Sequence, residues 1–433
     1  MKKIIYVIIG ALIVMALGFA LYPSRTNQAA PITQQKIKID NQTSTSFPTL
    51  IQDNPLVAQI DPNPYVQQLL NDYQQFIRKA ILSGQAPGAA VAIVRDSSII
   101  FLKGFGLKEI GTADSVNVNS VFRLGSVSKC FASVLTGTLV KDQLLHWDDK
   151  VTHYLPNFQL KNKENTDSLS IRHILSHTMG LPYHAFTNMV EERVPLDTLL
   201  VHLKEVNLIG LPGKVYSYQN VGYSLIEKVI HSATGKSYEE ALTEKIFQPL
   251  RMHNASASYA GITGNANVAR PHYFTKRGWR PTAISDTYYN VAPAGGVNAS
   301  IADMGLWLKA LLGTRHDVLS DETLNDILTP QVKAISKNRN FWRWKRPKAS
   351  YYAMGWRVLT FKNDTLDYHG GYVNGYRSEV ALDRKNKIAI CVLVNASGNL
   401  PDQSIPQFFA IRSRYIDLIN AWEKQNKALL VKR

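Results

Sequence analysis

A serine and a lysine lie three residues apart in the segment Ser126-Val127-Ser128-Lys129. A serine hydroxyl is a poor nucleophile unless a neighbouring group takes its proton. Residues three apart on a helix share one face, so a partly desolvated Lys129 amine could accept or relay the Ser126 proton. Gly125 and the apolar residues between 131 and 139 predict a helix starting near Ser126, where backbone N–H groups favour developing negative charge. The competing interpretation is a helix cap beside a solvated lysine.

A tyrosine and an asparagine two residues apart, Tyr218 and Asn220, form a second candidate pair. Residues two apart in an extended segment face the same side, so a phenol and an amide can point into one site. The pairs Tyr288–Asn290 and Tyr372–Asn374 repeat this spacing, but only Tyr218 follows the turn signal Pro212-Gly213 and precedes a helical stretch. The plainer alternative is a tyrosine and an asparagine on a loop surface.

A third candidate segment is His369-Gly370-Gly371-Tyr372, which we place just ahead of a strand expected at residues 379–382. Glycines there would let a substrate lie against the strand edge and leave a backbone N–H to face an oxyanion. His369 would be a hydrogen-bond donor beside it. The alternative is a histidine in a glycine-rich turn.

The elements that must position these residues are predicted from the spacing of apolar side chains. Helical spacing covers residues 66–77 and 408–422, and strands are expected at 89–94, 99–102, 379–382 and 387–394. Helices and loops dominate between the two ends. We therefore predict an α+β fold, with an antiparallel sheet flanked by N- and C-terminal helices and an inserted, mainly helical lobe over about residues 140–290.

The N-terminus carries an apolar run at residues 4–22 behind two lysines, which is long enough to cross a bilayer. Residues 1–22 are therefore either a signal peptide or a membrane anchor, and the rest of the chain would be exported to the periplasm or another extracytoplasmic space. Residues 23–60 are rich in Gln, Thr, Asn, Ser and Pro and indicate a flexible linker. The functional domain is expected over residues 61–425.

Composition excludes several classes of protein. A hydrophobic share of 45% excludes a disordered chain, and two cysteines exclude a disulfide scaffold or a four-cysteine zinc module. Cys130 and Cys391 are predicted to be buried thiols rather than a disulfide. His173 and His177 are four apart but lack the glutamate of a zinc-protease helix, so no metal and no cofactor is expected.

The net charge of +16 includes a basic segment from Lys333 to Lys348, which holds Trp342 and Trp344 and no acidic residue. The simplest interpretation is a solvated loop between a helix and a strand. The alternative is contact with anionic lipid or an envelope polymer, because cations and tryptophan suit a membrane surface. Nucleic-acid binding is rejected for an exported chain.

Taken together and in this order, the three motifs resemble those of the serine β-lactamase and penicillin-binding protein superfamily. The resemblance is closest to the branch of class C β-lactamases, D-Ala-D-Ala carboxypeptidases and esterases. Two further segments support it and extend the resemblance over residues 66–419: Ile171-Arg172-His173-Ile174-Leu175-Ser176-His177-Thr178-Met179-Gly180-Leu181, and Pro293-Ala294-Gly295-Gly296 followed by Ser300-Ile301-Ala302-Asp303.

The resemblance implies a role for each candidate residue. Ser126 would be the acylated nucleophile, Lys129 and Tyr218 would share the proton transfers, and Asn220 would bind the acyl-side amide of the substrate. Backbone N–H groups of Ser126 and Tyr372 would hold the oxyanion, beside substrate contacts at His369 and Gly371. We also expect the Lys129 cation to lower the pKa of Tyr218.

One departure from the family pattern bears on the substrate. β-Lactamases of this superfamily usually carry Lys-Thr-Gly where this chain has His369-Gly370-Gly371, so the site loses a fixed charge for a substrate carboxylate. The resemblance then implies an envelope hydrolase that cleaves D-amino-acid peptides or related amide and ester bonds. The alternatives are a class C-like β-lactamase, an esterase and a non-catalytic penicillin sensor. The partner in each case is a small-molecule or peptide substrate, with the membrane added if residues 4–22 stay uncleaved.

Overall fold

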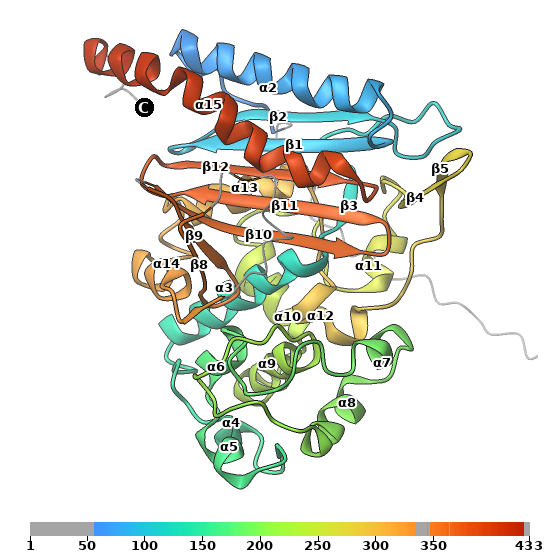
Figure 1. The fold of residues 1–433 in the computed structure, drawn as a ribbon, viewed down its shortest axis with the longest axis vertical. Coiled ribbons are helices and arrows are strands. Elements are labelled where there is room, and N and C mark those ends of the chain that lie inside the picture. Colours follow the sequence, from blue (N-terminus) through green and yellow to red (C-terminus); the bar gives the residue numbers. More distant parts are fainter. Residues whose placement is uncertain (1–55, 335–343, 345–346, 363, 428–433) are drawn as a thin grey trace, which may run out of the picture. The chain divides into compact units, whose positions relative to one another are not determined.

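The computed structural model describes residues 56–334, 344, 347–362 and 364–427, and its centre is one antiparallel sheet (Figure 1). Non-consecutive neighbours in this sheet show that both chain ends build it, as the sequence predicts. The strand order is β2 (Ser98–Gly106), β1 (Gly88–Arg95), β12 (Ile388–Val394), β11 (Tyr376–Asp383), β10 (Thr365–Val373), β9 (Arg357–Thr360), β8 (Ala349–Tyr352) and β7 (Val332–Lys333).

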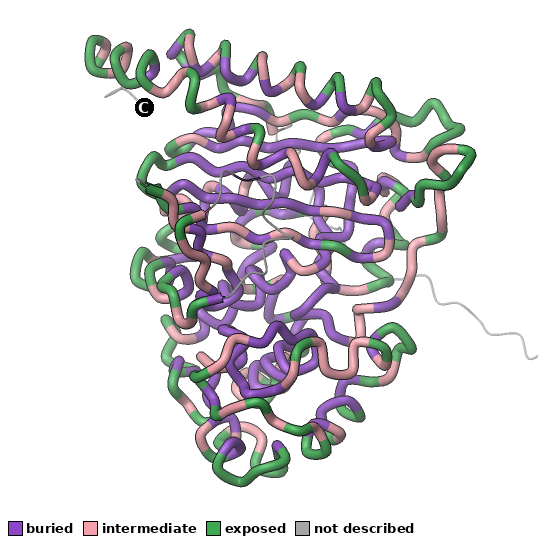
Figure 2. Tube along the Cα trace, in the orientation of Figure 1, coloured by how far each residue is buried: buried purple, intermediate pink, exposed green. Residues whose placement is uncertain are grey.

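Two layers of helix enclose the sheet. The terminal helices α2 (Pro64–Leu82) and α15 (Asn399–Gln425) pack on one face, where Tyr73 stacks edge-on against Phe408. The opposite face packs on α3 (Ser128–Lys141), α13 (Ile301–Leu311) and α14 (Asp321–Leu328). Strands β1, β11 and β12 are buried along almost their whole length, as Figure 2 shows, because apolar side chains meet a helical layer on either side.

The inserted lobe lies beyond α3 and is mainly helical. It contains short helices and one longer one, α9, whose buried residues form the lobe's centre. The helices are α4 (Val151–Tyr154), α5 (Lys163–Ser168), α6 (Ile171–Leu175), α7 (Thr187–Glu191), α8 (Leu196–His202), α9 (Val221–Thr234), α10 (Tyr238–Leu242) and α11 (Tyr259–Thr263), followed by the strands β4 (His272–Thr275) and β5 (Gly278–Pro281).

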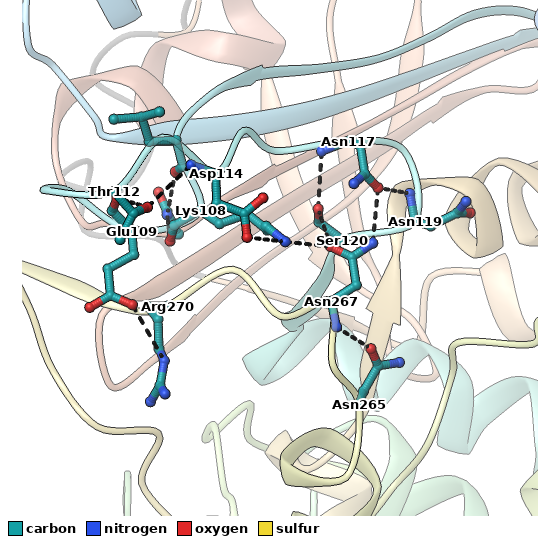
Figure 3. A network of polar contacts seen from close by, with 12 residues as sticks. Lys108, Glu109, Thr112, Asp114, Asn117, Asn119, Ser120, Asn265, Asn267 and Arg270 are labelled. Carbon is teal, nitrogen blue, oxygen red and sulfur yellow. Dashed lines mark hydrogen bonds and ion pairs between the residues drawn. The ribbon is translucent and has the colours of Figure 1, made fainter.

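The short strand β3 (Val121–Arg123) leads directly to the candidate nucleophile, and its position is fixed from two sides. It pairs with β6 (Asn298–Ser300), and the backbone of Val121 bonds to Asn267 and Ala269. Asn267 also accepts hydrogen bonds from Ser120 and Lys108, within the network of Figure 3. The loop ahead of β3 is thereby held against the segment that follows α11.

Two expectations about the sheet require correction. His369-Gly370-Gly371-Tyr372 precedes the strand expected at residues 379–382, which is part of β11, but the motif itself lies inside a further strand, β10, where Gly370 pairs with Glu379 of β11. Strands β8 and β9 escaped prediction because each has only four residues and lacks a clear alternation. β9 pairs with β10 and β8 pairs with β9, which extends the sheet beyond the third motif and, as shown below, brings an arginine to the site.

The remaining expectations about the chain vary in outcome. Cys130 and Cys391 are buried free thiols, as predicted. Trp344 of the basic segment is buried against Phe361 and Tyr368, which removes this tryptophan from lipid contact, while Trp342 lies outside the described residues. The predicted membrane segment at residues 4–22 also lies outside them. Within the described ranges no helix combines the length and hydropathy of a membrane span.

The predicted linker ends close to the folded body. Residues 23–55 are outside the described part of the chain, and the linker's last residues, 56–60, run beside β2, where the Gln59 N–H donates to the Ile99 carbonyl. Ordered helix starts at Pro64, capped by the side chain of Asn63. Asp61, where the functional domain is predicted to start, is buried.

Candidate active site

Ser126 and Lys129 lie at the start of α3, as the first motif predicts, but in a different local geometry. Ser126 is the centre of a 3₁₀ turn, η1 (Gly125–Val127), and α3 itself begins two residues later. Ser126 is partly exposed, whereas Lys129 is fully buried. The Lys129 Nζ lies 3.5 Å from the Ser126 Oγ, so the structure brings nucleophile and amine together.

The Lys129 amine is held by two acceptors in addition to the serine. Its Nζ donates to the Asn220 Oδ1 at 2.9 Å and to the Ala294 carbonyl at 2.8 Å. Burial, reinforced by the nearby Arg357, holds the pKa of Lys129 well below its ordinary value. In its neutral form the amine would have two N–H donors, which the bonds to Asn220 and Ala294 would use. Its lone pair then remains for the Ser126 proton, which is the requirement for a general base.

Tyr218 reaches the same point from the loop ahead of α9. Its ring centroid is 4.7 Å from the Lys129 Nζ, and a hydrogen bond with Ser126 acts on its hydroxyl. Burial raises the pKa of Tyr218, and this effect outweighs the lowering by the Ser126 hydrogen bond and by Arg357. The expected lowering of the Tyr218 pKa is therefore wrong, because burial disfavours the charged phenolate more than the neighbouring groups favour it. Tyr218 is a protonated phenol suited to relaying or donating a proton.

Backbone glycines bring β10 against the turn that carries Ser126. A Cβ on Gly371 would lie 2.0 Å from the Leu124 carbonyl and 3.0 Å from the Ser126 nitrogen. Gly125, at φ +51°, lies so close that its Cβ would be 2.8 Å from the Tyr372 nitrogen. The peptide groups of Ser126 and Tyr372 are therefore neighbours, which is the arrangement that an oxyanion site needs. The Tyr372 side chain is 56% exposed beside it.

The side chains of His369 and Asn220 differ in whether a polar atom remains available to bind a substrate. His369 is buried, and its Nδ1 contacts the Gly370 carbonyl at 2.9 Å while its Nε2 contacts the Tyr352 hydroxyl at 3.1 Å. Burial, together with Arg357 and Lys129, holds the pKa of His369 well below its ordinary value. A substrate would have to displace one of these contacts to reach the imidazole. For Asn220, the described residues offer a partner to Oδ1 but none to the amide Nδ2.

Two residues at the site carry no signal that sequence reasoning used. Arg357 of β9 lies with its guanidinium carbon 5.7 Å from the Tyr218 ring centroid, and it donates to the Tyr216 hydroxyl at 3.3 Å. Its neighbours include Tyr216, Tyr218 and Tyr352, and among the described residues no carboxylate forms an ion pair with it. The site thus regains a fixed positive charge from a strand that the sequence did not predict.

His177 is the second residue whose role was missed, because it was considered only as a metal ligand and as part of the family segment at residues 171–181. Its ring lies 4.3 Å from the Tyr218 ring, and its Nδ1 accepts the Gln219 N–H at 3.1 Å. Its carbonyl accepts the Ser217 N–H at 2.9 Å. His177 therefore holds the residues on both sides of Tyr218. His173, by contrast, contacts the Ser170 hydroxyl at the start of α6.

Comparison with known protein families gives a match that covers most of the chain. The family model described as beta-lactamase matches residues 66–408. The chain belongs to the β-lactamase family. This confirms the superfamily inferred from the motifs and the α+β architecture that it implies.

Individual members of the β-lactamase family are only distantly similar. "Protein flp" of Staphylococcus aureus strain N315 is 24% identical over 336 residues, which are 76% of this chain and 64% of the relative. "Unguisins hydrolase ungD'" of Aspergillus campestris is 24% identical over 337 residues, or 75% of this chain and 61% of the relative. The chain thus spans less than two thirds of the length of these relatives.

A solved structure shows the same fold. The octameric penicillin-binding protein homologue from Pyrococcus abyssi superposes with a TM-score of 0.68 at 22% identity, covering 81% of this chain and 77% of that one. At this identity the likeness concerns the β-lactamase/transpeptidase-like fold alone.

Proposed function

We propose that this chain is an exported serine hydrolase of the cell envelope that cleaves D-amino-acid peptides and related amide or ester bonds through an acyl-enzyme on Ser126. The Ser126 oxygen attacks the scissile carbonyl while Lys129, with Tyr218 as relay, takes its proton. Backbone N–H groups of Ser126 and Tyr372 hold the resulting oxyanion. The leaving nitrogen departs with a proton from Tyr218, and water then releases the acyl group from Ser126.

The observation that supports a peptide substrate is the position of Arg357. Among the described residues the guanidinium has no carboxylate partner, and it is half-buried beside the tyrosine that would protonate the leaving group, so it suits a carboxylate on the leaving side. When the last peptide bond of a substrate is cleaved, the leaving amino acid carries the C-terminal carboxylate of that peptide. The Arg357 guanidinium is permanently charged and can donate two parallel hydrogen bonds to a carboxylate. It can therefore bind a substrate carboxylate in a way that a neutral His369 cannot.

The test compares a peptide ending in D-Ala-D-Ala with the same peptide carrying a C-terminal amide, alongside a p-nitrophenyl ester and nitrocefin. Because a charged hydrogen bond contributes roughly 1.5–3 kcal/mol, we expect kcat/KM to favour the free carboxylate by about tenfold or more. Arg357→Gln should remove this preference while ester hydrolysis persists. Arg172→Gln, which alters an arginine paired with Asp148 in the helical lobe, is the matched control.

Two results contradict the proposal. Activity that survives Ser126→Ala would contradict an acyl-enzyme on Ser126. Equal kcat/KM values for the peptide with a free carboxylate and for its C-terminal amide would contradict the role of Arg357. A stable penicillin adduct without turnover would favour the sensor, and efficient nitrocefin hydrolysis would favour the β-lactamase. The export proposal rests on residues 4–22 and is tested separately, by fractionating cells that express the full chain.

A further inference from the structure

The hairpin formed by β4 and β5 stands apart from the main sheet as a two-stranded unit. Figure 1 shows it projecting at the end of the body where α2 ends, and Figure 2 shows that its tip is exposed. Its ten residues, His272 to Pro281, contain three cations, three aromatic residues besides the histidine and no acidic residue. This composition is unusual for a surface turn that only connects two segments.

The aromatic residues of the hairpin are held outward. Phe274 is 68% exposed and Tyr273 is 43% exposed. Phe274 packs edge-on against Trp279 at 5.0 Å, and the Trp279 Nε1 donates to the Gly84 carbonyl at 2.8 Å. That bond fixes the hairpin to the end of α2, where Leu82 is 84% exposed. Exposed apolar side chains from two elements therefore gather at one end of the body.

The cations around these side chains are not neutralised. In the part of the chain that the structure describes, no carboxylate forms an ion pair with Lys276, Arg277 or Arg280. The last turns of α2 add exposed Arg78 and Lys79.

The acidic residues of the neighbouring loop, which donates from Ile110 to the His272 ring, are already engaged. Glu109 lies 3.8 Å from Arg270, and Asp114 pairs with Lys108 at 2.6 Å (Figure 3). The surface around the hairpin thus keeps its positive charge.

We propose that the β4–β5 hairpin and the end of α2 form a docking surface for an anionic lipid membrane. Lysine and arginine are attracted to anionic headgroups, and aromatic side chains settle at the headgroup level of a bilayer. Phe274 and Leu82 supply the apolar contact, and the five cations supply the electrostatic one. A symmetric contact with a second copy is disfavoured, because it would bring the same cations face to face.

The docking surface adjoins the candidate active site. The turn after β10 approaches the hairpin base so closely that a Cβ on Gly375 would lie 3.0 Å from Pro271. Nearby Tyr372 contributes to the raised pKa of Tyr273, after burial. A body docked through this surface would hold Ser126 near the membrane. The inference stands without the proposed reaction, because it depends only on the hairpin's exposure and charge.

The test places a fluorescent reporter of polarity on the hairpin of the full chain. Cys130 and Cys391 are buried, so a new surface cysteine in Phe274→Cys can be labelled alone with an NBD dye. Val201→Cys in α8, 59% exposed, is the matched control. We expect a blue shift of the Phe274→Cys label on phosphatidylglycerol vesicles, reversed by salt and absent on phosphatidylcholine vesicles, whether or not residues 4–22 insert.

Charge removal gives a second, independent measurement. Lys276→Gln with Arg277→Gln should weaken the response to phosphatidylglycerol by about tenfold or more, as expected for two cations near the surface. No shift on anionic vesicles, an equal shift on neutral ones or an equal shift of the Val201→Cys label would each overturn the proposal. A concentration-dependent shift without lipid would indicate self-association instead and would overturn it as well.

Discussion

Replacing Gly371 by alanine should separate the two peptide groups that form the oxyanion site. The new Cβ would lie 2.0 Å from the Leu124 carbonyl oxygen, whereas real Cβ contacts stay beyond 3.0 Å, so the strand or the Ser126 turn must move by at least 3.0 − 2.0 = 1.0 Å. The Ser378 hydroxyl would lie 2.4 Å from the same Cβ, so the new methyl group could not avoid Leu124 by moving toward Ser378. A shift of this size at a reacting centre costs about 10²-fold, and loss of an oxyanion donor costs about 10²–10³-fold.

The assay is the rate of Ser126 labelling by a fluorophosphonate probe, together with p-nitrophenyl ester hydrolysis and thermal unfolding. We expect Gly371→Ala to lose about 10²-fold or more in both rates, with roughly 1–3 kcal/mol of stability lost to overpacking. Gly264→Ala is the control, because Gly264 is exposed, has φ −78° and has only the Ala260 carbonyl within 3.1 Å of a new Cβ. Near-normal labelling by folded Gly371→Ala would refute the close approach of β10 to Ser126.

Three further predictions follow from the described contacts. His177→Asn keeps an acceptor for the Gln219 N–H, whereas His177→Ala does not, so kcat should be about tenfold higher in the asparagine variant than in the alanine variant, at similar KM. Equal kcat values in the two folded variants would contradict the role of His177 in positioning Tyr218. The lowered pKa of Lys129 means that its amine loses its proton at a lower pH than a solvated lysine does, so the rising limb of the kcat/KM profile should lie well below the pH range of a solvated lysine. Tyr218→Phe should reduce the rate without moving this rising limb. A rising limb in the range of a solvated lysine would contradict the assignment of Lys129 as the base. Burial raises the pKa of Asp367 from 3.8 to about 6, so the folded state binds this proton more tightly than the unfolded state does. The free energy of unfolding should therefore fall as the pH rises from about 4 to 6. Asp367→Asn should abolish that fall in urea unfolding, and a variant that is instead less stable than the parent at about pH 7 would show that the ion pair with Arg384 dominates and would contradict the prediction.

Much of the fold was predictable because its signals are local. The apolar spacing of the terminal helices and of β1, β2, β11 and β12 reflects burial against a sheet or a helix layer, and the structure has these elements where they were expected. The four-residue strands β8 and β9 were missed, since they are too short to show a period; β9 pairs with β10, and β8 pairs with β9. The nine-residue strand β10, which contains the third motif, was missed because glycines are depleted in strands and Gly370-Gly371 indicates a turn.

The sequence by itself determined which groups could react: a serine and a lysine one helical turn apart, a phenol two residues from an amide, and glycines beside a histidine. These relations are set by backbone geometry over a few residues. Only the tertiary structure decided that Arg357 lies beside Tyr218, that His177 holds the Tyr218 loop, and that the Tyr218 pKa rises. Contacts and burial of this kind depend on segments that lie far apart along the chain, 42 residues apart for His177 and Gln219 and more than a hundred for Arg357 and Tyr218, and the local pattern carries no information about them.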